Sequence, residues 1–86
     1  MARNPNTPVY VLIVFAKVGP VAVKISVARN PNTPAEALTM LAGESHFVIR
    51  RFVARHKNVT KETLMDLTED SDERVRSAAL TEIEKR

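Results

Sequence analysis

Residues 28–53, ARNPNTPAEALTMLAGESHFVIRRFV, decide the fold of this chain, because they form one member of a repeated block of 26 residues. The opening motif of the block, ARNPNTP, also occurs unchanged at residues 2–8 and returns in altered form, as ARHKNVT, at residues 54–60. A repeat of this length forms one supersecondary unit, which buries its apolar face only by packing against its neighbours. The sequence therefore predicts a single domain, residues 1–86, of three units at 2–27, 28–53 and 54–79, with the last helix continuing to residue 86.

Apolar residues recur at matching positions of each block, with the spacing of one helix face. The first column is leucine in every block: Leu12, Leu38 and Leu64. Three residues later stand Phe15, Leu41 and Leu67. A second apolar segment begins at Val23, Ile49 and Val75. Each block therefore predicts two short helices joined by turns, and the chain predicts an all-α fold.

Helix-capping residues mark where the predicted helices begin. Thr33 and Glu36 have the spacing of a capping box, in which each side chain bonds the backbone amide of the other, and Pro34 suits the first helical position. This pattern predicts a helix that begins at Pro34. Thr60 is the predicted cap in the third block, and the polar residues 70–73 mark the start of the last helix.

The motif VARNPNTP, followed by LxxLA and then by a hydrophobic-Arg-x-x-Val-Ala segment, resembles the variant leucine-rich repeat family. Residues 28–53 carry the best match. The resemblance implies α- and 3₁₀-helices that alternate along a short right-handed solenoid, without β-strands. Some members of the family carry an iron–sulfur cluster in a cysteine-bearing segment. Because this chain has no cysteine, we predict no such cofactor.

The first block contains an uninterrupted apolar run, VYVLIVFA, at residues 9–16. Packing between units requires only some of these residues to be apolar. The additional apolar residues Val11, Ile13 and Val14 extend the apolar surface around most of the helix. A helix that is apolar on all sides is usually buried on all sides. We therefore predict a protein interface at these three residues, formed with a second copy or with another protein.

The same run allows other interpretations. Its β-branched residues suit a strand paired with residues 21–27, although the gapless repeat favours a helix. The run has about half the length of a membrane-spanning helix, so we expect no membrane insertion. It lacks the small-residue cleavage pattern of a signal peptide, and we expect a cytoplasmic protein.

Charge is distributed unevenly along the chain, whose formal net charge is +3. Residues 1–57 contain eight Lys and Arg against two Glu, whereas residues 58–86 contain five against eight acidic residues. This polarity suits head-to-tail association between copies, or a basic surface that binds nucleic acid.

Cationic residues recur at two positions of the block. One column holds Arg3, Arg29 and Arg55, and the other holds Lys24, Arg50 and Arg76. Helices packed roughly 8–10 Å apart would turn each column into a ladder of positive charge that follows phosphates. The candidate contacts for phosphates or an acidic partner are Arg29, Arg50, Arg51 and Arg55. The competing interpretation is structural, because a repeated cation often pairs with a carboxylate or carbonyl of the neighbouring unit.

The sequence gives little support for a catalytic or metal-binding site. His46 and His56 lack the cysteine or carboxylate spacing of a metal site, and we interpret both as surface histidines. The acidic residues 69–73 lack the glycine of a calcium loop, and they complement a helix dipole without a metal. We predict no catalytic residue, no cofactor, no metal and no small-molecule substrate.

The sequence thus predicts a non-catalytic interaction module that contacts protein or a second copy, with nucleic-acid binding as the alternative. Solenoids usually close their ends with polar capping units, whereas this chain opens inside the repeat motif. We therefore expect either a piece of a longer array or a first unit covered by another chain.

Overall fold

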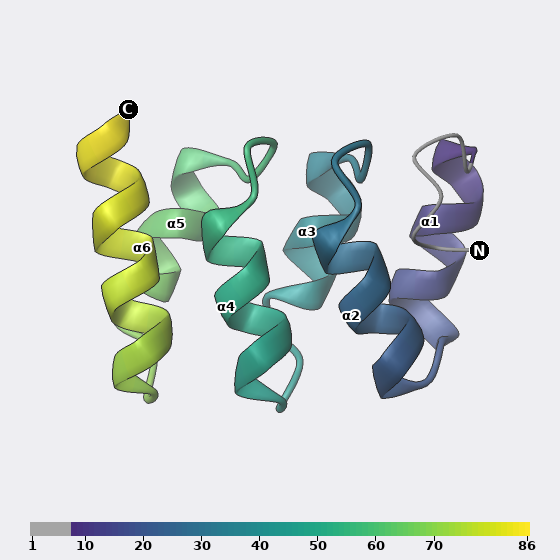
Figure 1. Ribbon diagram of the computed structural model, residues 1–86, viewed down its shortest axis with the longest axis horizontal. Coiled ribbons are helices and arrows are strands. Elements are labelled where there is room, and N and C mark those ends of the chain that lie inside the picture. The colour runs from purple at the N-terminus through teal and green to yellow at the C-terminus, as the bar shows by residue number, and fades with distance from the viewer. Residues whose placement is uncertain (1–7) are drawn as a thin grey trace.

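The computed structural model describes residues 8–86, in which six α-helices are joined by short turns (Figure 1). The helices are α1 (Val9–Val18), α2 (Val21–Arg29), α3 (Ala35–Leu41), α4 (Phe47–Arg55), α5 (Lys61–Leu67) and α6 (Glu73–Lys85). The described residues contain no β-strand, so the apolar run and residues 21–27 are helical and do not pair as strands. The all-α prediction is confirmed.

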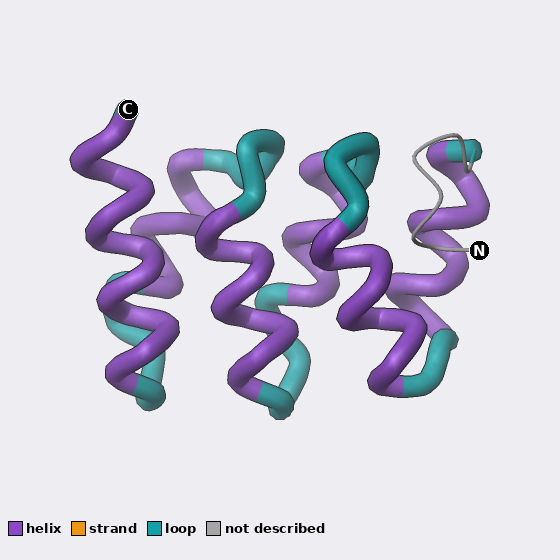
Figure 2. The backbone as a smooth tube through the Cα atoms, in the orientation of Figure 1, coloured by secondary structure: helices purple, strands orange, loops and turns teal. Residues whose placement is uncertain are grey.

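The helices form two layers (Figure 1). Helices α2, α4 and α6 lie side by side in one layer, and α1, α3 and α5 lie behind them. Contacts run along the layers, from α1 to α3, from α2 to α4 and from α4 to α6. The turns lie at two opposite edges of the layers (Figure 2). Each block of the sequence thus contributes one helix to each layer.

The helix starts follow the sequence repeat. Helices α2, α4 and α6 begin at Val21, Phe47 and Glu73, and each of these starts is 26 residues from the next. Helix α1 departs from the pattern, because it has ten residues where α3 and α5 have seven. A tight turn at Gly19 joins α1 to α2, and a Cβ at this position would lie 2.6 Å from the carbonyl oxygen of Phe15. Glycine is therefore needed at this turn.

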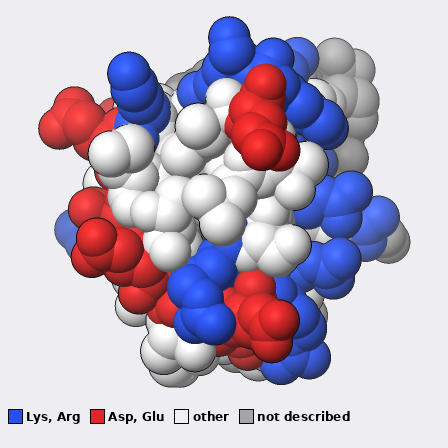
Figure 3. Space-filling model, turned by 90° about the vertical axis from the view of Figure 1, so that its left-hand side faces the viewer, with Lys and Arg blue, Asp and Glu red and all other residues white. Residues whose placement is uncertain are grey.

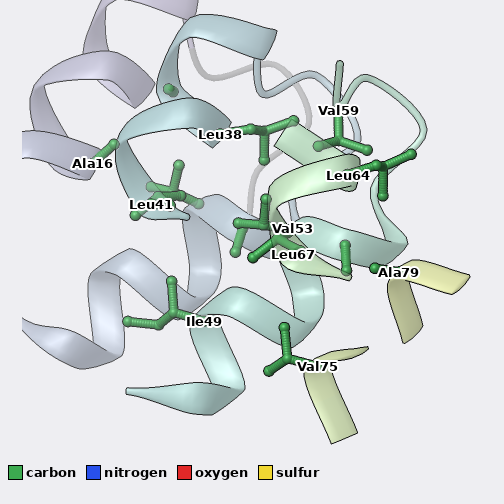
Figure 4. Close-up of a cluster of buried hydrophobic side chains, with 14 of the residues drawn as sticks. Ala16, Leu38, Leu41, Ile49, Val53, Val59, Leu64, Leu67, Val75 and Ala79 are labelled. Carbon is green, nitrogen blue, oxygen red and sulfur yellow. The ribbon is translucent and has the colours of Figure 1, made fainter. Parts of the chain in front are cut away.

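The core lies between the two layers and draws side chains from every helix (Figure 4). The leucine column of the repeat is fully buried, as predicted. The buried apolar residues include Leu12, Val27, Leu38, Leu41, Ile49, Val53, Leu64, Leu67 and Val75. Burying one such side chain contributes about 1.5–3 kcal/mol relative to leaving it in water, so the contacts between neighbouring units hold the layers together.

The predicted capping box at Thr33 is wrong. Helix α3 begins at Ala35 with Pro34 as its N-cap, and no side chain caps it. The Thr33 hydroxyl turns back and donates to the carbonyl oxygen of Val27 at 2.5 Å, so it bonds the end of α2 instead. The repeat explains the difference, because Pro34 occupies the position of Thr60, whose hydroxyl does accept from the Thr63 amide at 3.1 Å.

The predicted caps of the third unit are confirmed. Besides Thr60 at the start of α5, Asp72 caps α6 and accepts from the Arg74 amide at 2.8 Å. The implied 3₁₀-helices are wrong for the described residues, because the short helices are α-helical. The Leu38 amide donates to the Pro34 carbonyl at 3.2 Å, which is the i to i−4 bond of an α-helix.

Candidate interaction surfaces

One of the two cationic columns is occupied by contacts between units. The Arg50 guanidinium donates to both carboxylate oxygens of Asp70 in the next unit, at 2.7 and 3.1 Å. Lys24 donates to Glu44 at 3.0 Å in the matching place one unit earlier. The side chains of Arg50 and Asp70 are only 13% and 8% exposed. Because this guanidinium is already neutralised and largely shielded from water, Arg50 is a less favourable phosphate contact than an exposed cation.

Asp70 remains charged within this pair. Desolvation by burial opposes its negative charge, but hydrogen bonds from the Arg50 side chain and from the Asp72 amide outweigh that effect and lower the pKa of Asp70. The third member of the column, Arg76, donates to the Asp70 carbonyl oxygen at 2.7 Å. Within the described residues, Arg76 has no carboxylate partner of the kind that Arg50 and Lys24 have.

The other three predicted phosphate contacts lie on helices α2 and α4. Arg29, Arg51 and Arg55 are exposed, and none of them forms an ion pair with a described residue. Arg29 stacks over the Phe52 ring of α4, with 5.5 Å between the guanidinium carbon and the ring centroid. Arg55 lines two grooves, one on each side of α4.

The two grooves differ in charge. The groove between α2 and α4 has a volume of about 390 Å³ and contains three cations, Arg29, Arg55 and Lys57, without an acidic residue. The groove between α4 and α6, of about 580 Å³, mixes cations with two acidic residues. Arg74 in this second groove bonds Asp72 and lowers the pKa of that carboxyl to about 2. The first groove is therefore the more favourable site for an anion.

A large exposed apolar surface covers α1 and the first residue of α2. We call it the N-terminal apolar surface: Val9, Tyr10, Val14, Val18 and Val21. Tyr10 and Val18 are each 71% exposed and Val14 is 50% exposed. These five side chains are most of the exposed large apolar residues among residues 8–86, and the other two are Met65 and Leu80. Exposed apolar patches mark interaction sites on soluble proteins.

The predicted interface residues lie on different sides of α1. Val14 is exposed, whereas Val11 and Ile13 are half-buried, and Ile13 packs against the core. Val11 matches Ala37 and Thr63 of the other units, both of which are buried. Tyr10 and Val18 were not among the predicted interface residues. The repeat nevertheless carried a signal for them, since the matching residues of the second unit are both glutamate.

The C-terminal end of the stack also exposes apolar side chains. Leu80 of α6 is 53% exposed and Met65 of α5 is 55% exposed. Leu80 matches Ala28 and Ala54, which are buried in the earlier units. Viewed from this end, an uncharged area lies in the middle and charged groups surround it (Figure 3). This end therefore resembles an inter-unit contact without its partner.

His56 is buried, and its interpretation as a surface histidine is wrong. Its Nδ1 accepts from the Asn58 amide at 3.0 Å, and its Nε2 lies 2.7 Å from the Asn30 carbonyl oxygen. Desolvation by burial lowers the pKa of His56, with a further contribution from the charge of Lys57, against the opposing hydrogen bond to Asn30. The histidine thus ties the second and third units together. His46 is exposed, as predicted, and its Nδ1 accepts from the Val48 amide.

Among residues 8–86, no group of three or more His, Cys, Asp or Glu side chains is placed to hold a metal ion. Within the same range, no helix has both the length and the apolar character that crossing a membrane requires.

Comparison with known families supports the resemblance seen in the repeat. Residues 21–45 match the model of a family described as leucine rich repeat variant. The matched segment spans α2, α3 and the turn that follows α3. Comparisons with curated proteins and with solved structures gave no match. Residues 21–45 of this chain are therefore similar to the leucine rich repeat variant family.

Proposed function

We propose that the chain is a short right-handed solenoid of three 26-residue units that acts as a non-catalytic protein-interaction module, with its contact made through the N-terminal apolar surface. The observation that carries this proposal is the exposure of five large apolar side chains on α1 and the start of α2. Leaving such a surface in water forfeits about 25 cal/mol for each Å² of apolar area that a partner would cover.

The repeat supports the same conclusion. In the second unit, Glu36, Met40 and Glu44 stand where the first unit has Tyr10, Val14 and Val18. Glutamate therefore satisfies the packing at two of these positions, those of Tyr10 and Val18, and the apolar residues of the first unit serve a contact outside the unit. Such a surface suits a protein partner.

The test is sedimentation of the purified chain over a wide range of concentration. We expect the wild-type chain to self-associate and Val14→Asp to remain monomeric, because a charge in the middle of the N-terminal apolar surface must be desolvated on contact. Ser45→Asp adds the same charge on an exposed loop and serves as the matched control. A wild-type chain that stays monomeric throughout, or a Val14→Asp chain that associates like the wild type, would overturn the proposal.

Binding of phosphates is a second candidate function, favoured by the groove between α2 and α4, which Arg29, Arg55 and Lys57 line without an acidic residue. A DNA duplex is the probe. We expect binding that weakens with salt, with a slope of log K against log salt of about −0.9 for each phosphate contacted. The double variant Arg29→Glu, Arg55→Glu should abolish binding, whereas Lys61→Glu, on the other layer, should preserve most of it. Equal binding by both variants would exclude this groove.

A further inference from the structure

The two ends of the stack carry opposite charge. Residues 8–29, which include α1 and α2, contain Lys17, Lys24 and Arg29 and no acidic residue. The C-terminal end, residues 61–86, contains eight acidic residues against five Lys and Arg. Five of its acidic side chains are exposed and form no ion pair with a described residue: Glu62, Asp66, Glu69, Glu73 and Glu84. Opposite charge at the two ends favours contact between different ends of two copies and disfavours contact between like ends.

The C-terminal end exposes the positions that form contacts between units elsewhere in the chain. Near the end of α4, Ala54 is fully buried, and in α3 the Thr39 hydroxyl lies 3.5 Å from that of Thr63 in the next unit. The matching residues at the C-terminal end are Leu80 and Met65, both exposed. Larger apolar side chains thus replace Ala and Thr at this end, whose middle is uncharged in Figure 3.

The N-terminal end also leaves apolar side chains partly exposed. Phe15 matches Leu41 and Leu67, which are 0% and 3% exposed, yet Phe15 is only half-buried. Val18 lies on this side of α1, because its counterparts Glu44 and Asp70 accept hydrogen bonds from the preceding unit. The rest of the exposed row on α1, Val14 and Tyr10, precedes Val18 at helix spacings of four and eight residues. Lys17 is exposed within the same helix.

We propose that the N-terminal end of one copy docks on the C-terminal end of a second copy, which joins the chains head to tail. The inference rests on the proposed role of the N-terminal apolar surface and names its partner. Met65 and Leu80 meet that surface, and Lys17 lies toward the acidic side chains of α5 and α6. A head-to-tail contact uses two different surfaces and leaves one of each free, so it extends into open chains as concentration rises.

The contact does not copy the internal ion pairs. Continuing the repeat from Arg76 would call for a carboxylate at the position of Glu44 and Asp70, and the first unit has Val18 there. Apolar area and the opposite net charges of the two ends therefore carry the contact. We expect it to be weaker than the contacts inside the chain and to weaken as salt rises.

Two variants, each blocking one end, test the proposal by sedimentation. Val14→Asp blocks the N-terminal end and Leu80→Asp blocks the C-terminal end, and both sites are about half exposed, so the fold should tolerate them. Circular dichroism checks that each variant stays folded, and Ser45→Asp is the charge-matched control. Each blocked variant alone should raise the apparent dissociation constant at least about tenfold, equivalent to about 1.4 kcal/mol.

The mixture of the two variants is decisive. Leu80→Asp retains an intact N-terminal end and Val14→Asp retains an intact C-terminal end, so the mixture should form a dimer with one copy of each and no longer chains. A mixture that stays monomeric would overturn the head-to-tail contact.

The other outcomes separate this inference from the proposed function. If Leu80→Asp associates like the wild type and Val14→Asp does not, the N-terminal apolar surface mediates contact but the C-terminal end is not its partner. If Val14→Asp alone associates like the wild type, both proposals fall. A wild-type chain that is monomeric at every concentration also overturns both.

Discussion

At the scale of single residues, His56 links stability to pH. Its Nδ1 accepts from the Asn58 amide, so Nε2 carries the ring proton that is donated to the Asn30 carbonyl oxygen. A second proton on the ring would remove the acceptor and leave a charge in a desolvated place. Asn30 has the matching role in the preceding unit, where its Oδ1 accepts from the Asn32 amide at 2.9 Å.

The depressed pKa of His56 predicts that the chain loses stability in weak acid. Since the pKa lies below 6.5 in the folded chain, the unfolded chain binds the proton more readily, and stability rises with pH. The stability is complete above pH 6.5 and declines as pH falls below that value. Urea unfolding at several pH values between 5 and 8 measures the effect. His56→Asn keeps the turn and should flatten this dependence, and an unchanged slope would contradict the assignment.

At the scale of helices, the starts of α3 and α5 differ although they occupy the same place in the repeat. Thr60 caps α5 through its hydroxyl, whereas α3 begins after Pro34 without a side-chain cap. Glu36 therefore makes no capping bond and lies exposed on the first turn. Helix-dipole complementarity at an exposed position contributes only a few tenths of a kcal/mol to about 1 kcal/mol.

These two starts predict different responses to alanine. Thr60→Ala should reduce the free energy of unfolding by about 1 kcal/mol, because the Thr63 amide loses its partner. Glu36→Ala should change it by less than about 0.5 kcal/mol. Chemical denaturation of both variants under the same conditions measures the difference. Equal losses would restore the capping box that the sequence suggested.

The helices and the core were predictable from the sequence because their signals are local. The leucine column and its spacing place Leu38 and Leu64 on buried faces without knowledge of the neighbours. Residues whose surroundings come from another unit were not predictable in this way. His56 is buried by a loop 26 residues earlier, and Arg50 is neutralised by Asp70, 20 residues later. The exposure of Tyr10 and Val18 likewise depends on what packs beside α1.

At the scale of the whole molecule, stability resides in the packing between units. Leu41 is fully buried in the middle unit, so Leu41→Ala should cost roughly 2–5 kcal/mol and could unfold a chain of this size. Leu80→Ala, at a half-exposed site of the last unit, should cost far less. Thermal denaturation of dilute samples compares the two. An unchanged melting temperature for Leu41→Ala would contradict the placement of the core.

The even spacing of the helix starts also governs how the chain folds. Hydrogen bonds between units join residues only 20 to 30 positions apart, as in Arg50–Asp70 and Arg86–His56. No loop much longer than one unit has to close before such contacts form, and low contact order of this kind gives fast folding. Structure can therefore begin in the middle unit and spread to either side. Backbone amides in α4 should exchange with solvent most slowly, and those at both ends of the stack should exchange first.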